Sequence, residues 1–174
     1  MTDELTRRDV LKLGAAATLT VSLGRAESLA RAPTFFTADE LALVDELSEI
    51  IIPADAHSPG ARAAKVAPYI DARLAEGWDP KEKATWRDGL KVVDQVSRDM
   101  HGKALLQCSP QQRVAVVSRM AAREANPQRP EEAFFIQLKA RVVDAYYTSE
   151  IGIKQEMEYK GNSYLPEFVG FDVS

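Results

Sequence analysis

Apolar residues recur at steps of three and four positions through most of the chain after residue 36, which is the spacing of amphipathic helices. The first run begins at Thr37 and Glu40, which have the spacing of a capping box, and it ends before Pro53. We therefore predict a helix over residues 38–52. Its predicted inward-facing residues are Leu41, Val44, Leu47, Ile51 and Ile52.

The same spacing predicts four further helices, over residues 68–77, 80–101, 110–121 and 130–147. Each range has end signals typical of helix termini. These end residues are Pro68, Gly77, Asp79, Pro80, Gly102, Ser109, Pro110 and Pro130. The predicted inward-facing residues are Tyr69, Ile70, Leu74, Trp86, Leu90, Val93, Val96, Met100, Val114, Val117, Met120, Ala121, Phe134, Phe135, Leu138, Val142, Ala145 and Tyr146.

No stretch shows the two-residue alternation of a half-buried strand, and residues 53–66 have the proline, glycine and short polar residues of a loop. The predicted fold class is all-α. We expect a single small helical domain of about five helices over residues 33–148, followed by an irregular aromatic-rich tail over residues 149–174.

The tail interleaves aromatic residues with glycine and proline. Aromatic rings in a segment without regular secondary structure stabilise a protein only when other groups bury them. Two interpretations stay open: the rings pack on this domain's own helices, or they pack on the surface of a partner protein, since both environments favour Tyr and Phe.

The first 32 residues differ from the rest. Arg7, Arg8, Leu11 and Lys12 fit the pattern of a twin-arginine (Tat) export signal, and the uncharged stretch over residues 13–23 follows them. At about 11 residues this stretch is too short to span a membrane, which takes about 20. We therefore predict that residues 1–32 are a Tat signal and that the protein is periplasmic.

The site of signal cleavage stays open. Residues 30–32 read Ala-Arg-Ala, the form that signal peptidase prefers, but Pro33 would follow the cut; residues 24–26 are a weaker alternative. An uncleaved signal would leave an N-terminal membrane anchor.

Charge and cysteine content exclude some classes of function. The chain has 22 Lys and Arg against 26 Asp and Glu, with no basic block, which is a poor composition for binding nucleic acid. Cys108 is the only cysteine, so no disulfide can form within the chain, and we expect it to be a small buried apolar residue.

The sequence shows no recognised catalytic, cofactor-binding or metal-binding motif. His57 and His101 are too few and too far apart to suggest a zinc site, and Asp55 beside His57 is typical of a solvated turn. Ser149 lacks the context of a nucleophilic serine. We therefore predict no catalytic residue, and that the chain is not an enzyme by itself.

Two stretches, SEIIIPADAHSPGARAAKVAPYIDARLA and DAYYTSEIGIKQEMEYKGNSYLPEFVGFD, resemble the gluconate 2-dehydrogenase subunit 3 family. The resemblance covers essentially the whole chain. It implies a heteromeric, FAD-dependent sugar dehydrogenase, such as a gluconate or glucoside 3-dehydrogenase, without fixing the sugar. A large subunit of the glucose-methanol-choline (GMC) type would bind FAD, and a cytochrome c with haem c, as a subunit or soluble, would accept the electrons.

The resemblance also implies that the small subunit stabilises the large one and exports it through the Tat translocase, as a hitchhiker chaperone, with membrane association arising through the complex. The residues that we then expect at the partner interface are Tyr146, Tyr147, Thr148, Ser149, Gly152, Tyr159, Tyr164, Leu165, Pro166, Phe168 and Phe171. The alternative is an independent periplasmic helical module that binds a ligand in a pocket of its own.

Overall fold

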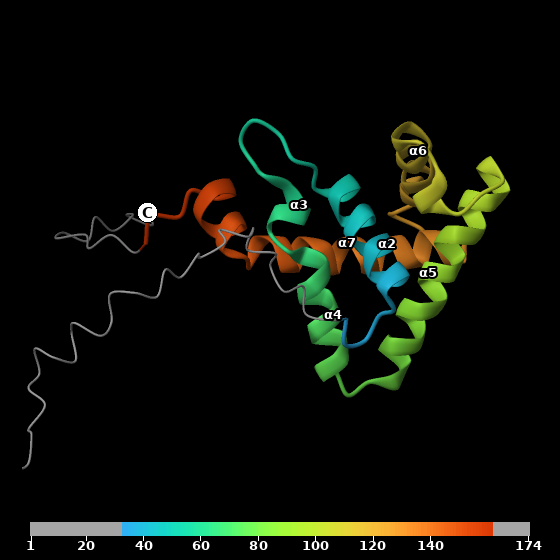
Figure 1. Ribbon diagram of the computed structural model, residues 1–174, viewed down its shortest axis with the longest axis horizontal. Helices are drawn as coiled ribbons and strands as arrows, with labels where there is room; N and C mark the ends of the chain where they lie inside the picture. Colours follow the sequence, from blue (N-terminus) through green and yellow to red (C-terminus); the bar gives the residue numbers. More distant parts are fainter. Residues whose placement is uncertain (1–32, 162–174) are drawn as a thin grey trace, which may run out of the picture. The chain divides into compact units, whose positions relative to one another are not determined.

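The computed structural model describes residues 33–161, and the described part is all-α (Figure 1). This confirms the predicted fold class. The helices, in chain order, are α2 (Ala38–Ile51), α3 (Gly60–Ala63), α4 (Val66–Glu76), α5 (Pro80–His101), the short 3₁₀ helix η1 (Leu105–Gln107), α6 (Pro110–Ala121), α7 (Pro130–Tyr147) and the π-helical turn η2 (Gly152–Glu156).

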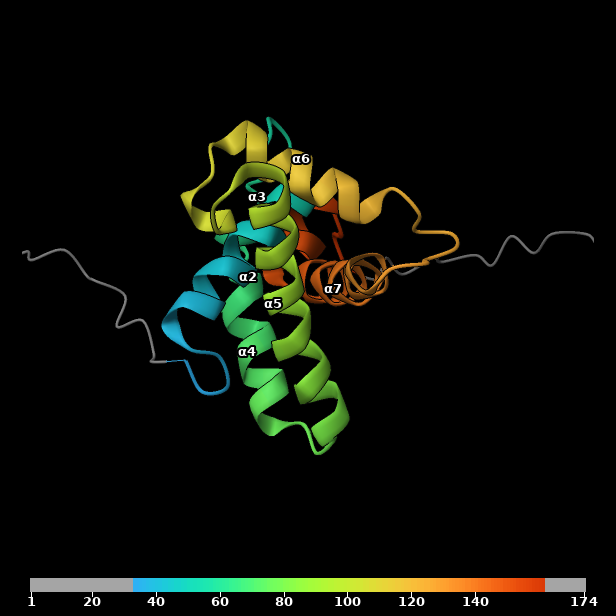
Figure 2. The same ribbon diagram turned by 90° about the vertical axis from the view of Figure 1, so that its right-hand side faces the viewer.

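The last long helix, α7, is the centre of the fold, and α2, α4, α5 and α6 all pack against it (Figures 1 and 2). Burial on several sides explains why its sequence is apolar over more than one face. Near its start, the ring of Phe134 meets Trp86 of α5 edge-on, with centroids 5.7 Å apart, and the centroid of the Phe36 ring lies 5.9 Å from that of Trp86. This aromatic group joins three distant parts of the chain.

The first residues of the described domain, 34–36, are held by hydrogen bonds to one buried carboxylate. Asp71 of α4 accepts the backbone N–H groups of Thr34, Phe35 and Phe36 at 2.7–2.9 Å, and the Thr34 hydroxyl at 2.8 Å. Burial raises the pKa of Asp71, but these donors outweigh it and hold that pKa below its ordinary value of 3.8. The bonds fix residues 34–36 on α4.

Local capping explains where the predicted helices begin. The Thr37 hydroxyl accepts the Glu40 N–H, and the Glu40 carboxylate accepts the Thr37 N–H at 2.8 Å, so the predicted capping box is present. The same exchange joins Ser109 and Gln112 at the start of α6. Both starts depend on residues only three positions apart.

Other details of the prediction are wrong. Val114 is 50% exposed, because the inner side of α6 is formed by Val116, Val117 and Met120, and Tyr69 of α4 is 40% exposed. The predicted loop over residues 53–66 contains α3, and α4 begins at Val66, two residues before Pro68. None of the helices that the structure describes is both long and apolar enough to cross a membrane.

Candidate subunit interface

Two neighbouring tyrosines at the end of α7 have different environments. Tyr146 is fully buried, and its hydroxyl hydrogen-bonds with the hydroxyl of the buried Ser58. Tyr147 is 38% exposed, and its ring stands edge-on to that of Tyr146, with centroids 5.3 Å apart. Tyr146 therefore lies in the core, as its predicted inward-facing position requires, and is not an exposed contact residue, which corrects the interface prediction; its ring packs against that of Tyr147.

Ser58 belongs to a tight loop over residues 52–61. Within it, one carboxylate oxygen of Asp55 accepts the N–H groups of His57 and Ser58, at 2.8 and 2.7 Å. These backbone bonds lower the pKa of Asp55 below its ordinary range. This is the solvated turn with local backbone bonds that the sequence predicts, and it aims Ser58 at α7.

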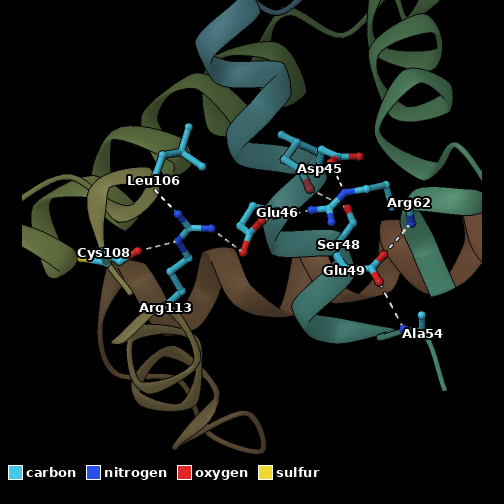
Figure 3. Close-up of polar contacts among 10 residues, drawn as sticks. Asp45, Glu46, Ser48, Glu49, Ala54, Arg62, Leu106, Cys108 and Arg113 are labelled. Atoms are coloured by element: carbon cyan, nitrogen blue, oxygen red, sulfur yellow. Dashed lines mark hydrogen bonds and ion pairs between the residues drawn. The ribbon is translucent and has the colours of Figure 1, made fainter. Parts of the chain in front are cut away.

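Glu49 of α2 closes the two ends of this loop. Its carboxylate accepts the N–H of Ala54 at 3.1 Å and that of Arg62 at 2.8 Å (Figure 3). Gly60 lies between them with φ of +81°, and a Cβ at this position would lie 2.6 Å from the Ala54 nitrogen. Only glycine adopts this conformation without strain.

A network of ion pairs extends from the same face of α2 (Figure 3). Arg62 binds Asp45 at 2.6 Å and Glu46 at 3.0 Å, and Arg113 of α6 binds the other oxygen of Glu46 at 2.9 Å. Burial raises the pKa of Glu46, but the two arginines outweigh it and lower that pKa overall. Arg113 also donates to the backbone carbonyl of Cys108 at 3.0 Å, so the network ties α2, α3 and α6 together.

The turn after α7 accounts for several predicted interface residues. Ser149 donates its hydroxyl to the Tyr146 carbonyl at 2.6 Å and accepts the Gly152 N–H at 3.0 Å. Thr148 is exposed, and its hydroxyl bonds to the Asp144 carbonyl at 2.6 Å. Gly152 is buried, and a Cβ there would lie 2.1 Å from the Tyr146 carbonyl oxygen. Ser149 and Gly152 therefore shape the turn.

Exposed apolar side chains lie on both sides of this turn: Tyr147 at 38%, Met157 at 50% and Tyr159 at 54%. We call these three residues the terminal surface. The Tyr159 N–H donates to the Ile153 carbonyl at 3.0 Å, which brings the chain after η2 back toward it. Tyr147 and Tyr159 belong to the predicted interface, whereas Met157 was not predicted and is added by the structure.

The other predicted site residues lie outside the described residues. They are Arg7, Arg8, Leu11 and Lys12 of the predicted signal, and Tyr164, Leu165, Pro166, Phe168 and Phe171 of the tail.

The sequence analysis missed Trp78, which is 97% exposed in the turn between α4 and α5. A signal was present: Trp78 stands between the end signal Gly77 and the cap Asp79, outside every apolar stripe. A large aromatic residue at such a position has no helical face on which to be buried.

No group of three or more His, Cys, Asp or Glu in residues 33–161 is arranged to hold a metal ion. His57 is exposed in the 52–61 loop, while the Nε2 atom of His101 at the end of α5 is buried without a hydrogen-bond partner. Cys108 is 4% exposed and its sulfur lies 3.3 Å from the Ser97 hydroxyl, so its predicted burial is confirmed.

Two cavities open on the surface of the described domain. The one between α2 and α5, of about 380 Å³, is bordered by Glu40, Lys91 and Asp94, and the other, of about 450 Å³, by Glu82 and Arg141. Some of the charged groups are paired within the chain: Asp94 accepts the Leu105 N–H at 3.0 Å, and Glu82 binds Arg141.

Comparison with known proteins gives one family. A model described as gluconate 2-dehydrogenase subunit 3 matches residues 38–166. The match includes the 52–61 loop, α7 and the terminal surface. Comparison with curated proteins and with solved structures gave no match.

Proposed function

The chain belongs to the gluconate 2-dehydrogenase subunit 3 family, and from this membership we propose that it is the non-catalytic small subunit of a periplasmic, FAD-dependent sugar dehydrogenase. In this proposal the chain stabilises the large GMC-type subunit, which binds FAD and oxidises the sugar. A cytochrome c, as a further subunit or as a soluble protein, carries the haem c that receives the electrons.

The observation that carries the proposal is the family match over residues 38–166, because that range contains the features that build and present the terminal surface. Ser58 and Tyr146 fix the end of α7, and the 52–61 loop holds Ser58. A small subunit needs a fixed surface of this kind, since a pre-ordered contact loses less entropy on binding than a mobile one. The apolar residues Tyr147 and Met157 are then available to a partner.

The proposal includes co-export. Arg7 and Arg8 fit the Tat pattern, and this pathway carries folded proteins. A large subunit that acquires FAD before export could then cross the membrane bound to this chain, without a signal of its own. The Tat translocase would therefore act on the assembled pair.

Co-expression tests the stabilising role. The large subunit is produced with and without this chain, and its soluble yield, FAD content and periplasmic fraction are measured. We expect all three to fall sharply when the chain is missing. Full yield and normal export of the large subunit alone would contradict the proposal.

Signal variants test co-export separately. The double variant Arg7→Lys/Arg8→Lys should leave both polypeptides in the cytoplasm, whereas Arg25→Lys, outside the twin-arginine pattern, should export both normally. If the double variant retains only this chain while the large subunit still reaches the periplasm, co-export is wrong and the stabilising role stands.

A further inference from the structure

One tryptophan stands apart from both the core and the terminal surface. Trp78 is 97% exposed, whereas Trp86, the other tryptophan of the chain, is 2% exposed. A Trp side chain presents a large surface that is mostly apolar, so its removal from water is strongly favourable. The described part of this chain provides no cover for Trp78.

The turn that carries Trp78 is held by hydrogen bonds on both sides. The Asp79 carboxylate accepts the Lys81 N–H at 2.8 Å and thereby starts α5. The Lys83 ammonium donates to the Ala75 carbonyl at 3.2 Å, which links α5 back to the end of α4. Trp78 is therefore presented on an ordered turn, and its docking would cost little backbone entropy.

The position of this turn suits a contact with another molecule. Helices α4 and α5 diverge from it in Figure 1, and it forms the lower end of the described domain in both views (Figures 1 and 2). In Figure 1 the C-terminal end of α7 lies at the left of the domain, away from this turn. The turn and the terminal surface are therefore separate places on the domain. Two separated contacts would fix the orientation of a partner better than one.

Charges around the turn favour a protein partner. Arg73 pairs with Glu76 at 3.6 Å, and Lys81 stands beside Asp79, so positive and negative groups balance. Surfaces that bind anionic lipid or nucleic acid carry clusters of Lys and Arg, and this turn has none. Exposed Trp in a balanced charge setting is typical of an anchor that enters an apolar recess of another protein.

We propose that Trp78 is an anchor residue for the large subunit of the dehydrogenase complex and that it enters an apolar recess on that subunit. This contact is separate from the terminal surface. The inference deepens the proposed function and rests on it, because it names the same partner.

Fluorine NMR tests whether Trp78 becomes buried. The chain is labelled with 5-fluorotryptophan and mixed with the unlabelled large subunit; Trp78→Phe identifies which of the two signals belongs to Trp78. In the free chain, the Trp78 signal should shift between H₂O and D₂O, and in the complex that solvent shift should disappear. A complex in which Trp78 keeps the shift would overturn the inference and leave the proposed function standing. Absence of any complex by size-exclusion chromatography would overturn both.

Affinity measurements provide the second test. Trp78→Ala should raise the Kd for the large subunit by about 30-fold or more, as expected of a hot-spot residue. Val114→Ala, which removes a half-exposed apolar side chain on α6, should change it less than about 3-fold. Equal, small effects of the two variants would refute the inference. The inference would also be refuted if Trp78→Ala left the Kd for the large subunit unchanged but abolished binding to neutral lipid vesicles or to the cytochrome.

Discussion

At the scale of single residues, Asp71 joins the entry of the chain to α4. Its carboxylate receives three backbone N–H groups and one hydroxyl, and a carboxylate with several donors is a strong acceptor. We expect Asp71→Asn to lower the free energy of unfolding by about 1–3 kcal/mol, because the amide leaves some of these donors without a good acceptor. Urea unfolding followed by fluorescence measures this. Asp88→Asn, at an exposed ion pair with Lys91, should change it by less than about 0.5 kcal/mol.

The lowered pKa of Asp71 also predicts how stability depends on pH. The folded-state pKa lies below 3.8, so the carboxylate stabilises the fold fully above about pH 5. This contribution is lost as the pH falls below 3.8 and through the folded-state value. The unfolding free energy of the wild type should therefore fall more steeply below pH 5 than that of Asp71→Asn. If the unfolding free energies of the wild type and of Asp71→Asn fall in parallel below pH 5, Asp71 is not the group responsible.

At the scale of elements, the junction between α7 and η2 depends on a close backbone approach at Gly152. We expect Gly152→Ala to displace η2, because the added Cβ would meet the backbone carbonyl of Tyr146 at 2.1 Å. Complex formation with the large subunit should weaken, while the helical circular dichroism of the domain changes little. Gln155→Ala, at an exposed position in the same turn, is the control. Unchanged affinity in Gly152→Ala would show that the conformation of this turn does not matter for binding.

The helices also differ in whether short sequence patterns predict them. The starts of α2 and α6 were predicted from Thr37 and Ser109, because a cap bonds to residues three positions away. Helix α3 was missed, because it follows a loop whose two ends are bound by Glu49 of the neighbouring helix. A local sequence pattern does not predict hydrogen bonds from a side chain on another helix.

At the scale of the whole molecule, the terminal surface should bind the large subunit without stabilising the small one. The double variant Tyr147→Ser/Met157→Ser removes apolar surface that is already partly exposed, so the stability of the isolated chain should change by less than about 1 kcal/mol. Pull-down of the large subunit should fall by at least about 10-fold. Val114→Ser is the matched control on α6, and an equal effect of this control would count against a specific interface.

The sequence by itself determined the all-α class, the five long helices and the turn at Asp55, because each is encoded in residues close together along the chain, and it determined the family through a resemblance that runs along most of the chain. The tertiary structure decided which side chains are covered. It joined the hydroxyl of Tyr146 to that of Ser58, placed Val114 at the surface and left Trp78 exposed. The physical reason is that exposure depends on which helices pack against a residue, and those helices come from distant parts of the sequence.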